Sequence, residues 1–80
     1  MNVTYDEERR RQEAVFEAVA NQLEVAMHAN SLSGPQLAMR SGMGENTIYR
    51  ILHANNVHLS SVIRLATAMR LRVRIELEPL

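Results

Sequence analysis

The sequence predicts a single, mostly α-helical domain, and three observations favour that class. The chain has 80 residues, the size of one small domain. Glycine and proline are few, at three and two residues, which excludes collagen-like repeats and disfavours disorder. Only three residues are aromatic, so the core must be aliphatic and methionine-filled, which favours helices over a β-sandwich.

A long first helix is expected from about residue 6 to residue 29, after a short β-prone stretch at residues 2–5 that could add a strand. The helical range lacks Gly and Pro and begins with acids, which the helix dipole favours. Apolar residues recur there at helical spacing and predict one core stripe: Phe16, Val19, Ala20, Leu23 and Met27. A second, weaker stripe is either covered by a partner chain or simply exposed: Val15, Ala18, Val25 and Ala29.

Three shorter helices are expected to follow. Ser33 is a suitable N-cap with Pro35 just inside the helix start, and that helix runs to about Ser41. Residues 42–44 (Gly-Met-Gly) break it, and a third helix covers about residues 45–53. After an Asn-containing loop at residues 54–58, a fourth helix covers about residues 59–70. Its predicted core residues are Leu59, Val62, Leu65, Ala66 and Met69.

Residues 71–78 alternate between charged and apolar side chains, which predicts a half-buried strand. A single strand needs a partner for its edge. If two copies pair antiparallel about Ile75, Arg74 faces Glu76 of the other copy, and opposite charges directly across a pair stabilise it. The sequence therefore predicts a homodimer formed through Arg72, Val73, Arg74, Ile75, Glu76, Leu77 and Glu78.

The charge pattern predicts a local basic surface. All nine cationic residues are Arg, which suits phosphate contacts better than Lys, and the net charge is zero. Residues 1–30 carry six acids against three Arg, whereas residues 31–70 carry four Arg against one Glu. A nucleic-acid partner would therefore have to meet the second region. Arg64 and Arg70 are expected on a solvated face or paired with acids of the first helix.

Several classes of protein are disfavoured. The absence of cysteine excludes disulfide scaffolds and cysteine zinc sites. No metalloprotease, phosphate-loop or nucleophile-elbow motif occurs, so no enzyme activity, catalytic residue, metal or cofactor is expected. The sequence shows no signal-peptide centre and no membrane-spanning apolar run, which predicts a cytoplasmic protein with no membrane partner.

The most informative spacing lies in residues 34–53. Ala38 is small and lies four residues before Gly42, which can adopt the left-handed conformation of a sharp turn. Ile48 and Ile51 lie three apart on one face of the next helix, where they can lock the two helices together.

This pattern resembles the helix-turn-helix of the Cro/C1-repressor (Xre) family, over about residues 15–70. The resemblance implies a lambda-repressor-like fold and rests on Leu37-Ala38, Gly42, Met43, Ile48, Ile51 and Leu65-Ala66. It also extends to small antitoxins of the HigA type and to prophage regulators, which typically dimerise and repress their own promoter. Gly34 stands where the family usually has Gln, with Gln36 nearby.

The resemblance implies double-stranded DNA as the partner and the helix at residues 45–53 as the recognition helix. Asn46 suits adenine, and Arg50 suits guanine or phosphate. The candidate base contacts are Glu45, Asn46, Thr47, Tyr49 and Arg50. The candidate DNA-backbone contacts are Ser33, Gln36, Arg40, Gly44, His53, Asn55 and Asn56.

We therefore expect a transcriptional repressor that binds an inverted repeat as a homodimer. Two alternatives remain open. One is an antitoxin that also binds a toxin protein through the long first helix. The other is a protein-interaction module that does not bind DNA, favoured by Gly34, Glu45 and the neutral net charge.

Overall fold

A computed structural model describes residues 5–55 and 57–80, and these ranges contain four α-helices. They are α1 (Tyr5–Ala29), α2 (Gly34–Ser41), α3 (Glu45–Leu52) and α4 (Leu59–Ala68). The mostly helical class is therefore confirmed, and each helix ends within two residues of its predicted bounds.

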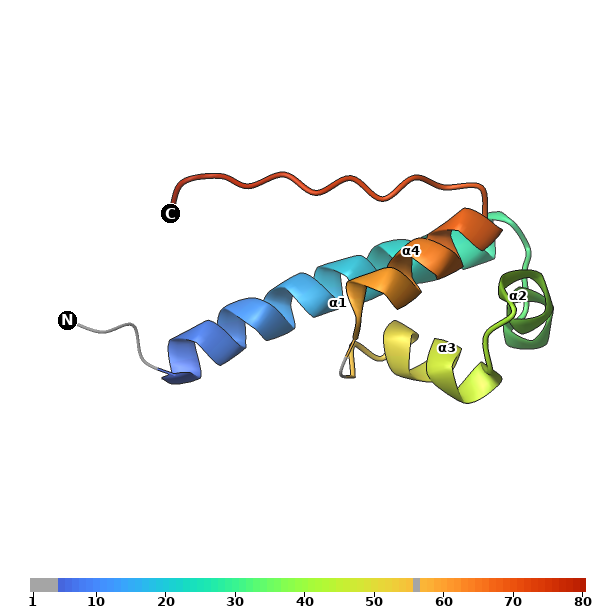
Figure 1. The fold of residues 1–80 in the computed structure, drawn as a ribbon, viewed down its shortest axis with the longest axis horizontal. Coiled ribbons are helices and arrows are strands. Elements are labelled where there is room, and N and C mark those ends of the chain that lie inside the picture. Colours follow the sequence, from blue (N-terminus) through green and yellow to red (C-terminus); the bar gives the residue numbers. More distant parts are fainter. Residues whose placement is uncertain (1–4, 56) are drawn as a thin grey trace.

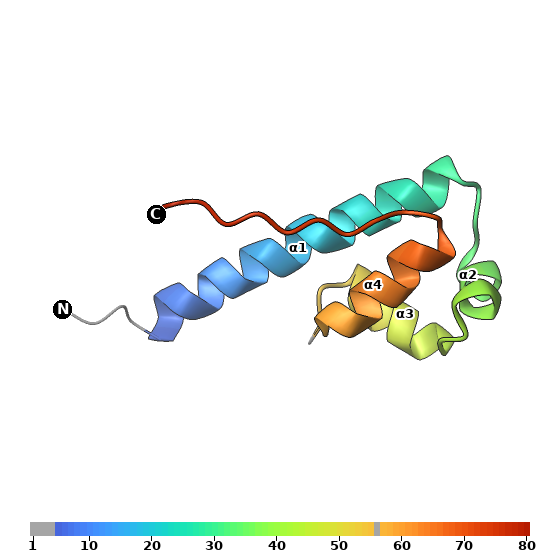
Figure 2. The ribbon, with the colours of Figure 1, turned by 45° about the horizontal axis from the view of Figure 1, so that its top comes forward.

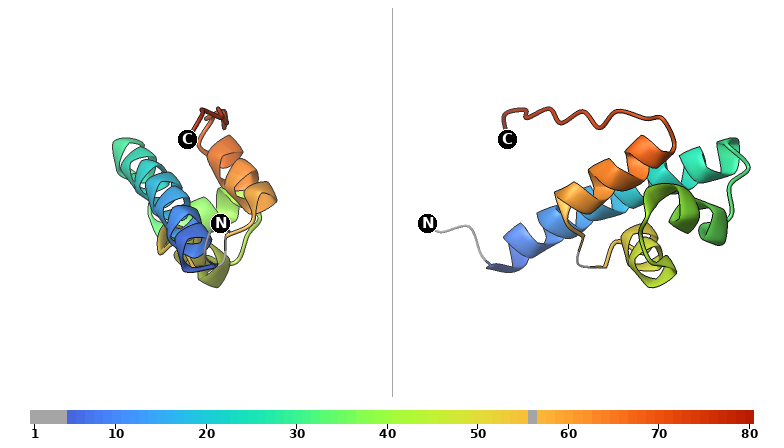
Figure 3. Two further views of the ribbon diagram at one scale, coloured as in Figure 1. Left: turned by 90° about the vertical axis from the view of Figure 1, so that its left-hand side faces the viewer. Right: turned by 45° about the vertical axis from the view of Figure 1, so that its right-hand side comes forward.

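The helix α1 forms the long axis of the molecule, which is 48 Å in its longest dimension. The three shorter helices gather beside its C-terminal half, and its first turns extend beyond them (Figure 1). Two further views show the same arrangement, with α2 and α3 on one side of α4 (Figure 3). The helix α3 contacts all three of the other helices, α1, α2 and α4.

The core is aliphatic, and no polar or charged residue of the described chain is buried. Leu37 of α2 and Leu65 of α4 are fully enclosed, and Leu65 is one of the predicted core residues of the fourth helix. Leu32 also joins this core, because it precedes the N-cap of α2. An apolar residue there commonly packs against the fourth helical residue, here Leu37. The buried set is Ala20, Leu23, Leu32, Leu37, Ile48, Ile51, Val62, Leu65, Ala66 and Met69.

The prediction that Leu59 is buried is wrong. Its side chain is 51% exposed, because Leu59 is the first residue of α4 and no neighbouring helix covers that end. Phe16 is half-buried rather than enclosed. All members of the second α1 stripe, from Val15 to Ala29, are exposed in the single chain.

Helix ends explain the sharp turns of this small fold. The predicted N-cap Ser33 is confirmed, and its hydroxyl accepts a hydrogen bond from the Gln36 N–H at 3.3 Å while Gln36 Oε1 accepts from the Ser33 N–H at 2.8 Å. After α1, α3 and α4 a left-handed residue follows the last turn. Its own N–H donates to a carbonyl three residues earlier, and the next N–H donates to a carbonyl five residues earlier. This pair of bonds is the Schellman motif, formed here without glycine.

The predicted strand at residues 71–78 is not formed in the single chain. After α4 the described residues run as an extended segment back along α1, toward its first turns (Figure 2). The physical reason is that a strand needs a second backbone for its ladder, and this segment has no neighbouring strand among the described residues. Residues 2–5 are the other stretch for which a strand was suggested. Tyr5 is instead the first residue of α1, and residues 2–4 lie outside the described residues.

In the described chain, none of the helices has both the length and the apolar character needed to cross a bilayer.

Candidate nucleic-acid interface

Small and apolar residues hold α2 and α3 together. Ile48 and Ile51 of α3 are buried in the same core as Leu37 of α2. Ala38 packs against this core, and its short side chain lets α3 come close. The predicted locking role of Ile48 and Ile51 therefore agrees with their burial, and it leaves the opposite face of α3 free.

The turn between the two helices is fixed by Gly42 and Ser41. Gly42 has φ of 71°, the left-handed conformation predicted from the spacing, and its N–H bonds the Ala38 carbonyl at 3.0 Å. The Ser41 hydroxyl donates to the Ala38 carbonyl at 3.4 Å and accepts from the Met43 N–H at 3.2 Å. These bonds set the position at which α3 begins.

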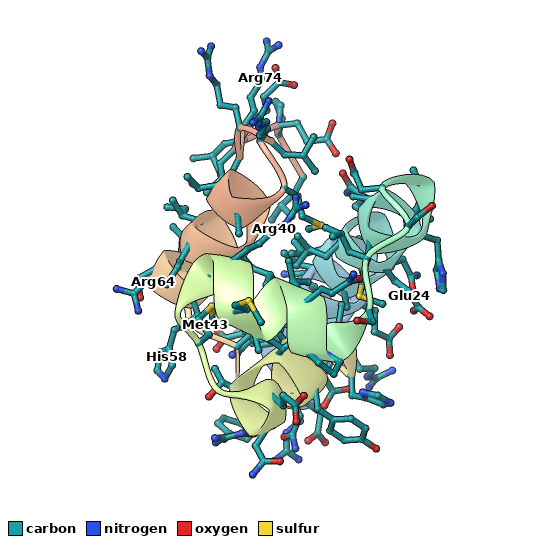
Figure 4. The ribbon with its side chains drawn as sticks, turned by 90° about the vertical axis from the view of Figure 1, so that its right-hand side faces the viewer. Glu24, Arg40, Met43, His58, Arg64 and Arg74 are labelled. Carbon is teal, nitrogen blue, oxygen red and sulfur yellow. The ribbon has the colours of Figure 1, made fainter. Side chains whose placement is uncertain are left out.

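The outer face of α3 carries most of the predicted base contacts. Glu45, Asn46, Tyr49 and Arg50 are exposed, whereas Thr47 is half-buried. Side chains from α3 project outward at the edge of the molecule, away from α1 and α4 (Figure 4). No ion pair within the described ranges engages Arg50. Amide, guanidinium and hydroxyl groups on one helix face are the groups that read base edges.

Thr47 lines a hollow between the start of α3 and the start of α4. The hollow is about 430 Å³, and its other walls come from residues 42–44 and from Ser60, Ser61 and Arg64. Neither α3 nor α4 has a side-chain N-cap, and within the described residues the N–H groups of the first two residues of each helix have no hydrogen-bond partner, whereas the Thr47 and Ser61 N–H groups donate to the Gly44 and His58 carbonyls. Hydroxyls, a guanidinium and helix N-termini are all donors suited to a phosphate group.

Sequence reasoning missed the α4 side of this hollow. Arg64 was expected on a solvated face or paired with an α1 acid; it is exposed, and the ion pairs of the described residues do not include it. It extends outward from α4, on the same side as His58 (Figure 4). The sequence signal that could have predicted this side of the hollow is the position of Arg64, four residues after Ser60 and three after Ser61, near a helix start.

The other side of α3 is acidic. Tyr49 and His53 stack with ring centroids 3.8 Å apart, and His53 Nδ1 lies 2.8 Å from the Tyr49 carbonyl oxygen, which accepts its hydrogen. The same two side chains share a hollow with Glu13 and Glu17 of α1. These carboxylates repel phosphate, so the α4 side of α3 is the better path for a DNA backbone.

The remaining predicted backbone contacts are scattered. Ser33 and Gln36 use their side chains in the α2 capping box. Arg40 is exposed and extends from α2 on the side away from α3 (Figure 4). Gly44 is the N-cap of α3. Asn55 is exposed and follows the C-terminal end of α3, and Asn56 lies outside the described residues.

Among the described residues, no group of three or more His, Cys, Asp or Glu side chains is placed to hold a metal ion. Comparisons with protein-family models, with curated proteins and with solved structures found no match to this chain.

Proposed function

We propose that this chain is a sequence-specific DNA-binding regulator that inserts α3 into the major groove. The observation that carries the proposal is the two-sided character of α3. Its apolar face is buried through Ile48 and Ile51, while Asn46 and Arg50 on the outer face are exposed. A short helix anchored in this way can present side chains to base edges without unfolding.

Asn46 and Arg50 supply the base readout in this proposal. An Asn amide matches the donor and acceptor of adenine, and a guanidinium matches the two acceptors of guanine. Glu45 accepts from cytosine and repels phosphate, so it selects against misplaced binding. Thr47 is placed for either base readout or phosphate binding, because it lines the hollow shared with α4.

Arg64, Ser60 and Ser61 supply the phosphate grip. All three line the hollow beside the N-terminus of α3, so a phosphate held there would fix the register of that helix on the duplex. Gly44 contributes its backbone at the same place. The neutral net charge of the chain is compatible with this grip, because the acids are concentrated in α1.

We propose further that two copies bind together. The resemblance to Cro/C1 repressors implies an inverted-repeat operator, with the two recognition helices roughly 34 Å apart along the duplex. Occupancy of such a site within a promoter would block polymerase, which makes the protein a repressor.

The test begins with selection of bound duplexes from a random library, followed by fluorescence anisotropy at two salt concentrations. Enrichment of an inverted repeat, with affinity that falls steeply as salt rises, supports the proposal. Equal binding of selected and scrambled duplexes contradicts sequence-specific binding. No binding at low salt supports the interaction-module alternative.

Variants then separate the two roles. Arg50→Ala should lower affinity for the selected duplex roughly ten-fold or more, with little effect on a scrambled duplex. Arg64→Ala should weaken both duplexes alike and reduce the salt slope by about one. Arg10→Ala is the matched control, because Arg10 is an exposed Arg on α1. Wild-type affinity in the Arg50 variant would contradict the assignment of α3.

An antitoxin role is the second candidate, and one observation favours it. Val15 and Val25 of α1 are 60% and 69% exposed, and no described residue covers them. A toxin protein could bury this face. Val15→Glu should then weaken binding to the protein encoded beside this gene and leave DNA affinity unchanged. Equal affinity of the Val15 variant for that protein would contradict this role for α1.

A further inference from the structure

The C-terminal segment, residues 71–80, is anchored at one end and open along the rest. The Leu71 N–H bonds the Ala66 carbonyl at 2.9 Å, and Val73 packs against the core. From residue 72 onward, no hydrogen bond joins the backbone of the segment to another described residue. The segment continues along α1 with both of its edges unpaired (Figures 1 and 2).

The segment already has the two faces of a strand. Arg74 and Glu76 form an ion pair, so side chains two residues apart share one face. Val73 lies against the core and therefore belongs to the opposite face, together with Ile75 and Leu77 by alternation. Ile75 is 60% exposed and Leu77 is 95% exposed, so an apolar face stands uncovered.

We propose that a second copy of this chain pairs with residues 71–78 as an antiparallel strand centred on Ile75. In this register Arg74 lies opposite the partner's Glu76, and Arg72 lies opposite the partner's Glu78. Every charged pair across the two strands is then opposite in sign.

Other arrangements place like charges together. A shift of the antiparallel register by two residues one way sets Arg74 opposite the partner's Arg74. A shift by two residues the other way sets Glu76 opposite the partner's Glu76. A parallel pairing in register sets every charge opposite its own copy. Among the antiparallel registers within two residues and the in-register parallel pairing, the charges therefore favour the antiparallel register centred on Ile75.

The structure also shows what the apolar face of the pair would meet. A hollow of about 140 Å³ lies between α1, α4 and the start of the segment, and its apolar walls include Val19, Val62 and Val73. In the proposed register the partner's Leu77 lies directly across from Val73. Its side chain would therefore lie at the rim of this hollow and extend the core of the first copy.

This inference rests on the proposed pairing of two copies and deepens it by naming residues 71–78 as their interface, and its test needs no DNA, so it can fail independently of DNA binding by α3. The measurement is the mass in solution of the full chain, by sedimentation over a range of concentrations. A reversible dimer is expected. A monomer at every concentration up to the millimolar range would overturn the proposal.

Disulfide crosslinking tests the register. The chain has no cysteine, so any covalent dimer must come from the introduced one. Ile75→Cys places two thiols opposite each other, within the Cα separation that a disulfide allows, and should give a covalent dimer on mild oxidation. Leu77→Cys is the matched control, because its opposite residue is Val73, and it should crosslink far more slowly. Equal crosslinking of both variants would overturn the register.

Charge redistribution tests the attraction between the strands. Arg72→Glu with Arg74→Glu gives an acidic segment, and Glu76→Arg with Glu78→Arg gives a basic one. Each variant alone should remain monomeric, and an equimolar mixture should dimerise. These exposed residues leave the core untouched, which circular dichroism of each variant checks. Dimers of either variant alone would overturn the proposed pairing.

Discussion

A single left-handed residue ends the last turn of every helix in the described chain. These residues are Ser31, Gly42, Ala54 and Arg70, with φ between 53° and 71°. Only one of them is glycine, the residue that adopts this conformation at no steric cost. Backbone strain is therefore distributed over the loops that follow α1, α3 and α4.

At Gly42 we predict that substitution by alanine lowers the free energy of unfolding by about 1 kcal/mol, because a Cβ is strained at this φ. Ala54→Gly should raise the free energy of unfolding by a similar amount, because glycine is not strained at this φ. Gly34→Ala is the control, since Gly34 is helical and an added Cβ meets nothing within 4 Å. Urea denaturation measures all three, and equal losses at Gly42 and Gly34 would contradict the conformational explanation.

The eight-residue helix α2 depends on its caps more than a longer helix would. An isolated helix of this length is unstable in water, so the capping box and the packing of Leu32 against the core must hold its first turn. The position of α3 depends in turn on α2, because the bonds of Ser41 and Gly42 fix the turn that leads from α2 to α3.

Removal of the cap hydroxyl in Ser33→Ala should therefore destabilise the protein by about 1 kcal/mol. Faster amide hydrogen exchange should be confined largely to α2 and the start of α3. Ser60→Ala serves as the comparison, because the Ser60 side chain makes no hydrogen bond within the described chain. An unchanged midpoint in the Ser33 variant would show that packing alone fixes α2.

At the scale of the whole molecule, the C-terminal segment divides into an anchor and an arm at Arg74. Val73 is the last residue that packs against the core. A chain that ends after Arg74 should melt at the same temperature as the full chain at low concentration, but should not dimerise. A chain that ends after Arg70 also loses Val73 and should melt at a lower temperature. A lower melting temperature of the first truncation would show that residues 75–80 stabilise the single chain.

Hydrophobic periodicity predicted the helices and most of the core, because these depend on local spacing. Val62, Leu65 and Ala66 follow it closely, and Gly42 and Ser33 have the backbone roles that their chemistry suggested. What spacing could not predict depends on the assembled fold. Leu59 is exposed because nothing covers its end of α4, and Arg64 meets the start of α3 only after the chain has folded. No strand forms at residues 71–78, because the single chain offers this segment no second backbone with which to pair.

The stacked rings of Tyr49 and His53 have a spectroscopic consequence. The chain contains two tyrosines and no tryptophan, and the other tyrosine, Tyr5, lies on the first turn of α1. Tyr5→Phe would leave one natural fluorophore, mounted on α3 against an imidazole ring. Ultraviolet emission would then report on α3 alone, without an attached dye.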